Sequence, residues 1–419
     1  MKRVRLLDVA TLCAFFVVGP VLAESSDFEE ILIKGRVLQS DQMNALKTPT
    51  PIINVPQSLS IVTDEDVRKK GFKEIGDIVR YTPGINTSLG EGHRDAVVFR
   101  GVRSTADFYQ DGVRDDVQYY RPLYNVEQVE VLRGPNALLF GRGGTGGIIN
   151  RVSKKAVNGQ DFKTVDIGID SFGATDLAAD VNTNLSDSVA FRLNVHSDSL
   201  ENHRDFYNGD RFGINPTVNI ALDADTDLDL SYEYIDHERF IDRGIPTANG
   251  EPVKALSDIV FGDKDGNLNT VEASVLRAAL SHRFSDSTKG SLSLTSSSFE
   301  KMYQNTYANS YDLDTNVVEM DGYHDPTERD NLILSASLVN ELNFANMTHT
   351  ILTGFESVKT DNTNKRFNTY WTTNDCDVSN YDRESFAVAD PIDFSVNASG
   401  TATAVEYTNS CALKSSTET

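Results

Sequence analysis

The chain has 419 residues and is acidic, with 62 Asp and Glu against 39 Lys and Arg and a formal net charge of −23. This charge argues against nucleic acid and against anionic lipid as partners, because like charges repel. After residue 23 no run of about 18 apolar residues occurs, so no membrane-spanning helix is expected. The remaining chain is therefore either soluble or crosses a membrane as a β-barrel.

Residues 1–23 have the composition of a secretory signal peptide. Lys2, Arg3 and Arg5 precede an apolar core that ends in Val21-Leu22-Ala23. We expect cleavage after Ala23. Cys13 lies in the middle of the apolar core, so lipidation of this cysteine is not expected.

Residues 24–49 are short of core-forming side chains and predict a flexible segment. They contain one short insert of acid, apolar and small residues, made of Glu29, Glu30, Ile31, Leu32, Ile33, Lys34 and Gly35. Such an extended peptide can add itself as an edge strand to the sheet of a partner protein. The alternative is an ordinary short strand at the start of the next domain.

Residues 50–155 predict a mixed α+β domain. Thr63 is a candidate N-cap followed by three acids, and Gly71 is a candidate end for this first helix. A second short helix is expected through Ile75 and Val79, ending at Thr82-Pro83-Gly84. Strands and turns are expected after it.

The stretch 125–150 predicts a strand, a turn at Gly134-Pro135, a glycine-rich crossing and a second strand. Gly141, Gly143 and Gly146 formally satisfy the spacing of a dinucleotide-binding loop. That site needs a helix directly after the glycines, whereas residues 148–152 (IINRV) predict a strand. Nucleotide binding is therefore not expected.

From residue 163 the pattern changes to two-residue alternation of apolar and polar side chains, as in Val189, Phe191, Leu193 and Val195. One apolar face and one polar face are what a lipid-facing barrel strand requires. About nine such strands of roughly ten residues are expected between residues 163 and 359. A soluble β-sandwich is the alternative.

The connections between these strands alternate in length. Short turns are expected at 186–187, 223–227, 285–289 and 344–348, and long polar segments at 197–210, 236–270, 304–329 and from 359 onward. Short turns on one side and long loops on the other are typical of outer-membrane barrels.

Several segments together resemble one family. The segments are VPQSLSIV (55–62), IGDIVRYTPGI (75–85), FRGV (99–102), YQDGV (109–113) and the glycine-rich stretch 125–150. In this order they resemble the plug domain of TonB-dependent outer-membrane receptors. Residues 108–115 and 119–121 resemble the ferric-siderophore branch of that family.

The resemblance implies a fold and a domain order. It implies a signal peptide (1–23), a flexible segment with a TonB box at Glu29 to Gly35 (24–49), an α+β plug domain (50–155) and the first part of an antiparallel transmembrane β-barrel (162–419). The family barrel has about 22 strands, so about nine strands cannot close around a plug. The chain is therefore expected to be the N-terminal part of a longer receptor.

The resemblance also implies a function. The protein would lie in outer-membrane lipid, bind a ferric siderophore and import it when a TonB-type inner-membrane energy transducer pulls on the TonB box. No cofactor is expected, because the iron is cargo. The alternatives are another cargo (haem, cobalamin, a glycan or a peptide), a passive adhesin or channel, and a truncated receptor that does not transport.

Substrate in this family rests on outward-facing plug loops. The residues at the corresponding positions are His93, Arg94, Tyr109, Gln110, Tyr119, Tyr120 and Arg121. Cations and amides suit the oxygens of an iron chelate, and aromatic rings suit its rings. The alternative is that the tyrosines pack the plug against the barrel wall.

Arg100 and Arg133 match two family arginines that pair with barrel glutamates and hold the plug in place. Their partners are expected in the part of the barrel that this sequence does not contain.

No catalytic constellation is present: there is no G-x-S-x-G, no H-E-x-x-H, and the seven histidines are scattered. The protein is therefore expected not to be an enzyme. Residues 263–269 (DKDGNLN) place oxygens at alternate positions like a calcium loop, but the glycine comes two places early and no acid stands at the twelfth position. A surface turn is expected there, and no metal site.

Cys376 and Cys411 lie in a polar region of an exported chain. A disulfide that closes an exposed loop is the favoured interpretation.

Overall fold

The computed structural model describes residues 55, 57–88, 91–134, 144, 146–263, 266–345, 347–368, 370–371, 383–388 and 405–406. The signal peptide, the TonB-box residues Glu29 to Gly35, and Cys376 and Cys411 lie outside the described residues. Within the described part, no helix is both long and apolar enough to cross a membrane.

Two short helices open the plug domain after strand β1 (Ser58–Thr63). Helix α3 (Asp64–Lys70) has Thr63 as its N-cap, and Gly71 ends it in the left-handed conformation at φ 65°. Thr63 and Asp66 form a capping box, which satisfies backbone donors of the first turn. Helix α4 (Ile75–Arg80) ends at Tyr81, two residues before Pro83. Both predicted helices are confirmed.

The remaining plug strands form two small sheets. The five-stranded sheet has the order β1-β7-β8-β5-β6, and the three-stranded sheet the order β2-β3-β4. Strands β5 and β8 are parallel, and the other pairs are antiparallel. The bounds are β2 Ile85–Thr87, β3 Val97–Phe99, β4 Val102–Ser104, β5 Phe108–Gln110, β6 Val113–Arg114, β7 Val126–Arg133 and β8 Gly147–Ser153.

The two strands predicted around the glycine-rich crossing are confirmed as β7 and β8. Gly147 at the start of β8 shows why one of these glycines is needed: a Cβ there would lie 2.4 Å from the carbonyl oxygen of Leu132. The plug core lies between this sheet and the helices. Its fully buried members include Ile75, Ile78, Val129, Val131 and Ile149.

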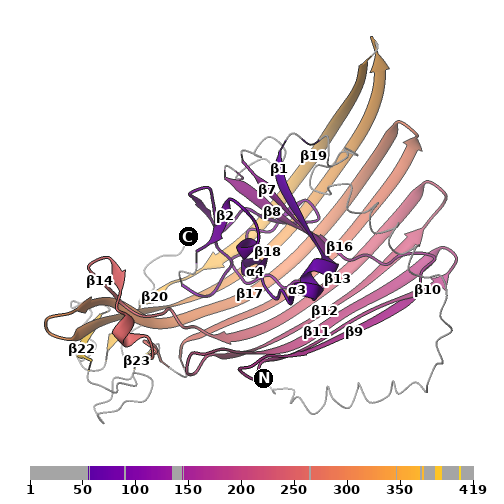
Figure 1. Ribbon diagram of the computed structural model, residues 1–419. Helices are drawn as coiled ribbons and strands as arrows, with labels where there is room; N and C mark the ends of the chain where they lie inside the picture. Colours follow the sequence, from indigo (N-terminus) through magenta and orange to yellow (C-terminus); the bar gives the residue numbers. More distant parts are fainter. Residues whose placement is uncertain are drawn as a thin grey trace, which may run out of the picture. The chain divides into compact units, whose positions relative to one another are not determined.

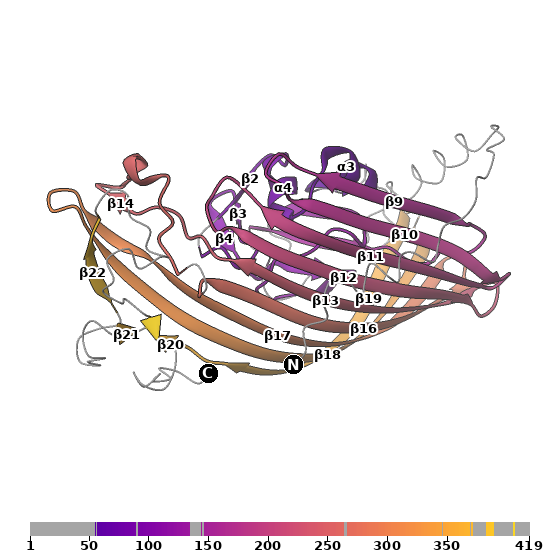
Figure 2. The same ribbon diagram turned by 90° about the horizontal axis from the view of Figure 1, so that it is seen from below.

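The rest of the chain builds one long antiparallel sheet with the strand path β19-β18-β17-β16-β13-β12-β11-β10-β9. The plug domain lies against one face of this sheet (Figure 1, Figure 2). The bounds are β9 Phe162–Ile169, β10 Thr175–Ser186, β11 Val189–Glu201, β12 Asn208–Ala221, β13 Thr226–Phe240, β16 Leu268–Ser285, β17 Thr288–Asp312, β18 Val317–Phe344 and β19 Met347–Asn364. The predicted fold class, with about nine strands in one sheet, is confirmed.

Smaller elements occupy the long connections and the end of the chain. They are β14 Thr247–Ala248, β15 Glu251–Pro252, η2 Lys254–Leu256, β20 Phe367–Asn368, β21 Tyr370–Trp371, β22 Glu384–Ala387 and β23 Val405–Glu406. Strands β20 and β22 both pair with β18.

The two faces of the long sheet differ as the alternation predicts. On β11, Arg192, Asn194 and His196 point toward the plug domain and are buried. On β9, Val165 and Ile167 point away from it and are 61% and 80% exposed. An apolar outer face and a polar inner face are typical of outer-membrane barrels.

Several strands are longer than the sequence pattern predicts. Residues 304–329 are expected to form a long polar loop, but β17 continues to Asp312 and β18 begins at Val317. The stretch 197–210 is likewise mostly paired in β11 and β12. Apolar side chains are few in these stretches, so the alternation that marks a strand is sparse there.

Candidate functional site

An aromatic cluster joins the plug domain to β17 and β18 near their long hairpin. It consists of His93, Tyr303, Tyr307 and Tyr323. The ring of His93 stacks on that of Tyr303 with centroids 3.8 Å apart, and Tyr323 meets Tyr303 edge-on at 5.6 Å. Tyr307 meets Tyr323 edge-on at 6.3 Å. Aromatic pairs in these geometries stabilise the folded protein by more than the burial of their apolar surface alone.

The tyrosine hydroxyls fix the plug loop around residue 91. Tyr303 donates to the backbone oxygen of Glu91 at 2.6 Å, and Tyr323 donates to its carboxylate at 3.2 Å. Tyr307 donates to Asp321 at 3.1 Å. The plug loop is therefore held by the inner wall of the long sheet.

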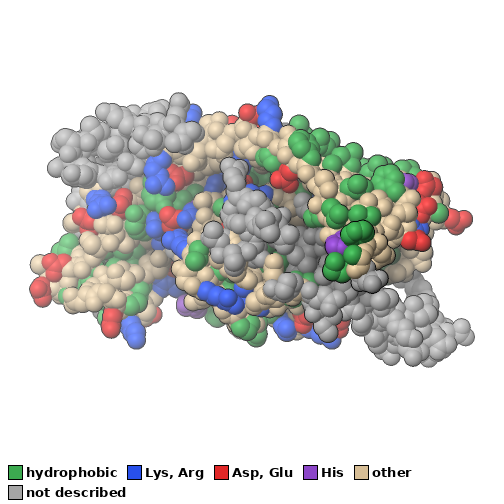
Figure 3. All heavy atoms as spheres, turned by 90° about the horizontal axis from the view of Figure 1, so that it is seen from above, with side chains coloured by type: hydrophobic (Ala, Val, Ile, Leu, Met, Phe, Trp, Pro, Cys, Tyr) green, Lys and Arg blue, Asp and Glu red, His purple; other side chains and the backbone are tan. Residues whose placement is uncertain are grey.

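Cations surround this cluster. The guanidinium carbon of Arg243 lies 3.7 Å from the ring centroid of Tyr307, and that of Arg366 lies 4.1 Å from Tyr323. Lys301 donates to the backbone oxygen of Gln118 at 3.0 Å. Figure 3 shows Lys and Arg interleaved with Asp and Glu toward its left-hand end, while hydrophobic side chains gather toward the right.

His93 lies in the field of these cations. Arg94 donates to Nε2 of His93 at 2.8 Å and forms an ion pair with Glu91. Burial lowers the pKa of His93 well below its ordinary value, and Lys301, Arg94 and Arg243 lower it further. His93 is therefore a neutral ring at physiological pH.

A second group of predicted residues lies in a buried network inside the plug domain. The Arg121 side chain has no exposed surface; its Nε donates to Asp115 at 2.9 Å and its Nη1 lies 3.4 Å from Asp95. Arg151 and Tyr119 also donate to Asp115, at 3.0 Å each. Arg121 is thus neutralised by carboxylates of the plug domain itself.

The two carboxylates of this network have opposite pKa shifts. Burial raises the pKa of Asp115, but Arg121 and Arg151 outweigh it and hold the pKa below its ordinary value. Burial raises the pKa of Asp95 to about 6, because attraction by Arg121 offsets it only in part. Asp115 lies between two guanidinium groups, which explains the difference.

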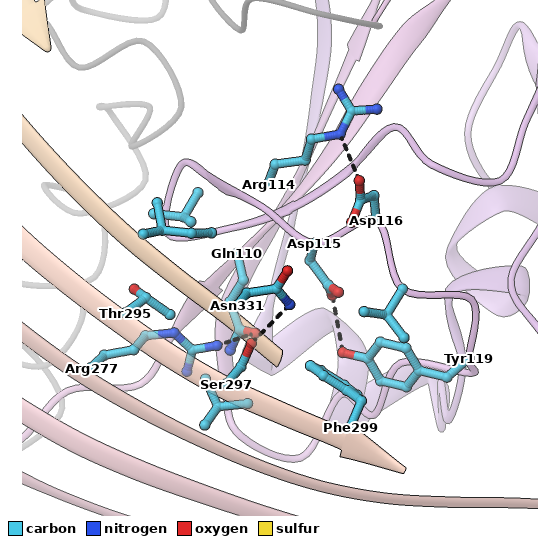
Figure 4. Close-up of a pocket in the computed structure, with 14 residues that line it drawn as sticks. Gln110, Arg114, Asp115, Asp116, Tyr119, Arg277, Thr295, Ser297, Phe299 and Asn331 are labelled. Carbon is cyan, nitrogen blue, oxygen red and sulfur yellow. Dashed lines mark hydrogen bonds and ion pairs between the residues drawn. The ribbon is translucent and has the colours of Figure 1, made fainter. Parts of the chain in front are cut away.

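Gln110 links this network to the long sheet. Its Oε1 accepts from Arg151 at 3.0 Å and from Arg277 of β16 at 2.6 Å, and its Nε2 donates to Ser153 at 2.9 Å and to Glu233 of β13 at 3.3 Å. Figure 4 shows the pocket beside it, between the plug loop and the inner faces of β16, β17 and β18. Lining residues include Asp115, Asp116, Tyr119, Ser297, Phe299 and Asn331.

Tyr120 and Tyr109 have different surroundings. Tyr120 lies under the guanidinium of Arg239 at 4.0 Å, and Arg239 in turn donates to Glu74 of the plug domain at 2.7 Å. Tyr109 is 2% exposed and packs with Leu132 and other apolar residues.

The predicted site residues therefore separate into groups. The structure brings His93 and Arg94 together at the aromatic cluster, and places Gln110, Tyr119 and Arg121 in the buried network. Contact of any of them with substrate stays a prediction. The sequence analysis missed Tyr303, Tyr307 and Tyr323, although tyrosines at even spacing in a polar stretch indicate one face of a strand.

Arg100 and Arg133, predicted to hold the plug in place, lie beside each other. A Cβ on Gly84 would lie 3.7 Å from both side chains. Arg133 donates to Ser58 at 3.0 Å and to the backbone oxygen of Pro83 at 2.9 Å. Burial lowers the pKa of Arg133, as does Arg100. Neither arginine has an acidic partner among the described residues, so the predicted pairing with barrel glutamates stays a prediction.

No group of three or more His, Cys, Asp or Glu able to hold a metal ion occurs in the described ranges. At the segment considered for calcium, Gly266 and Asn267 donate backbone N–H groups to the backbone oxygen of Asp263 at 3.2 Å and 2.8 Å. These bonds are those of a turn.

Comparison with known proteins identifies the first domain and the fold. Residues 51–148 match the TonB-dependent Receptor Plug Domain. The siderophore receptor PiuA from Acinetobacter baumannii superposes with a TM-score of 0.75 at 23% identity, over 84% of this chain and 53% of that one. The predicted resemblance to the TonB-dependent receptors is confirmed. The long sheet is accordingly made of barrel strands.

Proteins similar to this chain extend beyond the matched region. The probable TonB-dependent siderophore receptor PiuA from Acinetobacter baumannii is 29% identical over 262 residues, which are 59% of this chain and 35% of that protein. The catecholate siderophore receptor Fiu from Escherichia coli K12 is 30% identical over 213 residues, covering 48% of this chain and 27% of Fiu. The matches thus span about a third or less of the length of these relatives.

Proposed function

We propose that this receptor lies in the outer membrane, binds a ferric siderophore at the aromatic cluster and imports it by TonB-coupled transport. The observation that carries the proposal is the aromatic cluster itself. His93 of the plug domain stacks on Tyr303 of the long sheet, and Tyr303 in turn meets Tyr323. The guanidinium groups of Arg243 and Arg366 lie on Tyr307 and Tyr323, beside the long β17–β18 hairpin. The similarity to proteins described as siderophore receptors supports it.

Import, more than catalysis, fits the chemistry of the described residues. The buried carboxylates and guanidinium groups of the plug domain are paired with one another, as Arg121 is with Asp95 and Asp115. The plug domain also bonds to the long sheet at many points, which suits a domain that closes a lumen and must be moved for transport. The apolar outer face of the strands suits outer-membrane lipid.

The partner for import would be a TonB-type inner-membrane transducer that pairs with the TonB box. An edge-strand peptide needs its backbone donors, and proline removes one. Ile31→Pro should therefore abolish uptake and leave binding at the cell surface unchanged. Ile31→Val keeps the backbone donor and should leave both uptake and binding unchanged. Uptake that survives Ile31→Pro would overturn the assignment of the TonB box.

Cargo is tested with radioactive iron on cells that express the receptor under iron limitation. We expect saturable binding of ferric siderophores, with no competition from haem or cobalamin. Competition by haem or cobalamin, together with failure of every ferric chelate to bind, would overturn the proposed cargo and favour one of the other cargoes of the family.

A further inference from the structure

The rings of the aromatic cluster are covered in this structure. His93 is 4% exposed, Tyr303 1% and Tyr323 8%. Tyr307 is partly exposed, but the guanidinium carbon of Arg243 lies 3.7 Å from its ring centroid and 5.8 Å from that of Tyr323. A ligand that binds to these rings must therefore displace what covers them.

The cover is the first part of the connection between β13 and β16. We call residues 241–263, which include β14, β15 and η2, the lid. Ile241 at its start is fully buried in the aromatic cluster, and Arg243 follows it. A Cβ on Gly92 of the plug loop would lie 3.5 Å from the backbone oxygen of Asp242. The lid therefore lies on both the rings and the plug loop.

The lid is folded and shares an apolar core with the β17–β18 hairpin. Leu256 and Phe261 of the lid are buried together with Val318 and Met320 of β18. Strand β14 of the lid lies beside the far end of β17 (Figure 1, Figure 2). Opening of the lid must expose this core, so the open state is a minor one.

The base of the lid is fixed to β16 and β17. The backbone N–H of Ile241 donates to the backbone oxygen of Asn267 at 2.9 Å, and the side-chain amide of Asn267 donates back to Ile241 at 2.9 Å. The same amide donates to the backbone oxygen of Thr306 at 2.9 Å. Movement of the lid therefore begins after Ile241, and it lifts Arg243 from the ring of Tyr307.

One arginine of the neighbouring connection fastens the lid. Arg204, between β11 and β12, donates from Nε to Asp242 at 2.5 Å and from Nη2 to the backbone oxygen of Ile259 at 2.7 Å. Its Nη1 donates to the backbone oxygen of Ser257. The side chains of Arg204 and Asp242 are 13% and 9% exposed, and charge-assisted bonds are among the stronger bonds in proteins. Arg204 thus ties two distant parts of the lid to a different loop.

We propose that the lid is a gate that is closed before cargo arrives, and that Arg204 is the positioning residue that keeps it closed. This inference rests on the proposed function, because it concerns access to the same aromatic cluster. Cargo binds the open state, so the apparent affinity is reduced by the fraction of receptor that is open. Weakening the bonds of Arg204 should therefore strengthen binding, whereas losing a residue that contacts cargo weakens it.

Two variants break the ion pair from its two sides. Arg204→Gln removes the cation. Asp242→Asn removes the negative charge, while its amide oxygen can still accept from the backbone N–H of Gly244 as the carboxylate does. Arg204→Lys keeps the positive charge. The matched control is Arg283→Gln at the other end of β16, where Arg283 donates to Asp225 at 2.7 Å with 49% of its side chain exposed.

Hydrogen exchange tests the gate without any cargo, on the receptor in lipid bilayers. Amides of residues 253–259 should exchange roughly 10- to 100-fold faster in Arg204→Gln and in Asp242→Asn, the factor that one charged hydrogen bond contributes. The double variant should exceed either single variant only slightly, because both substitutions break the same ion pair. Amides of β16 should not change in any variant, which shows that the sheet is folded.

The second measurement follows binding of a ferric tris-catecholate complex to the same preparations by stopped flow. The association rate of the unmodified receptor should level off at high probe concentration, at the rate of lid opening. In Arg204→Gln and Asp242→Asn this plateau should rise and Kd should fall, each by about tenfold or more. Arg204→Lys should lie between these variants and the unmodified receptor, and Arg283→Gln should match the unmodified receptor.

Weaker binding in Arg204→Gln with unchanged exchange of the lid would overturn the inference, because Arg204 would then contact cargo. Faster exchange with weaker binding would also overturn it, since the lid would then act by closing over cargo that is already bound. Unchanged exchange with unchanged binding would show that Arg204 does not hold the lid. If exchange of the lid rises as expected but no ferric complex binds any form of the receptor, the proposed function falls, while the role of Arg204 in holding the lid stands.

Discussion

Glu74 of the plug domain holds two arginines of the barrel sheet. Its Oε1 accepts from Arg239 of β13 at 2.7 Å and from Arg211 of β12 at 3.1 Å. The side chains of Arg211 and Arg239 are 4% and 6% exposed, and that of Glu74 is 26% exposed. Because Glu74 directly precedes α4, we expect Glu74→Gln to loosen this helix from the barrel wall.

The free energy lost in Glu74→Gln depends on the partners that Arg211 and Arg239 still have. Arg211 keeps its ion pair with Asp198, whereas Arg239 loses its one acidic partner among the described residues and keeps the ring of Tyr120 and a hydrogen bond with Tyr207. Removing one partner of a buried pair costs about 3–5 kcal/mol. Since a quarter of the Glu74 side chain is exposed, we expect a loss of about 2–3 kcal/mol, or roughly 30- to 150-fold in local opening.

Hydrogen exchange measures this opening directly. Amides of α4 should exchange faster in Glu74→Gln by that factor, while amides of β7 should change little. Lys73→Gln is the matched control, because Lys73 pairs with Asp176 of β10 while 46% exposed. An exposed pair contributes at most about 1 kcal/mol. Equal acceleration in both variants, or none at α4, would refute the reasoning.

The same contact has a pH dependence with a definite sign. Burial raises the pKa of Glu74, but Arg239 and Arg211 outweigh it and hold the pKa below 4.5. A lowered carboxyl pKa stabilises the folded state above the ordinary pKa, and this stability is lost as the pH falls through the folded value. Exchange at α4 should therefore rise only below about pH 4.5, and Glu74→Gln should remove this dependence.

Four further predictions concern stability. The pKa of Asp95 is raised from 3.8 to about 6, so the folded state binds this proton more tightly; stability should fall as the pH rises from about 4 to 6 and then level off, and thermal unfolding of Asp95→Asn should not show this slope. In Gly213→Ala the new Cβ would lie 2.9 Å from a ring carbon of Tyr124, which should lower stability by about 1–3 kcal/mol in thermal unfolding. Gly76→Ala in α4, whose nearest neighbour would be 3.6 Å away, should stabilise by up to about 1 kcal/mol, and a loss in both would contradict this. Arg121→Met leaves the buried Asp95 without its ion-pair partner and Asp115 with Arg151 alone, and should cost about 3–5 kcal/mol; a plug domain that still resists proteolysis as before would contradict the role of this network.

Local sequence predicts the helix ends and the strand faces of this fold because each depends only on neighbouring residues. Thr63 and Gly71 bound α3 through capping and a left-handed turn, which need only neighbouring residues. The alternation in β9 to β13 marks which side chains point away from the plug domain, since successive side chains of a strand point to opposite faces. The family resemblance likewise rests on short contiguous segments of the plug domain.

The length of β17 and β18 could not be predicted in this way. Their outer parts are mostly polar and carry only a few buried apolar or aromatic side chains, among them Tyr303, Val318 and Met320, so the alternation that marks a strand is sparse. Only pairing between the two strands, from Thr288 with Asn340 to Asp312 with Val317, shows that they continue. That pairing also decides which tyrosines share the inner face.

The candidate site depended on tertiary structure most of all. The sequence favoured Arg121 as a substrate contact, but whether a guanidinium is free or neutralised depends on distant residues, here Asp95. The stack of His93 on Tyr303 joins residues far apart in the chain through the seating of the plug domain on the sheet. Sequence alone therefore determined the types of element and the resemblance to one family, while packing between domains decided which charges are neutralised inside the protein.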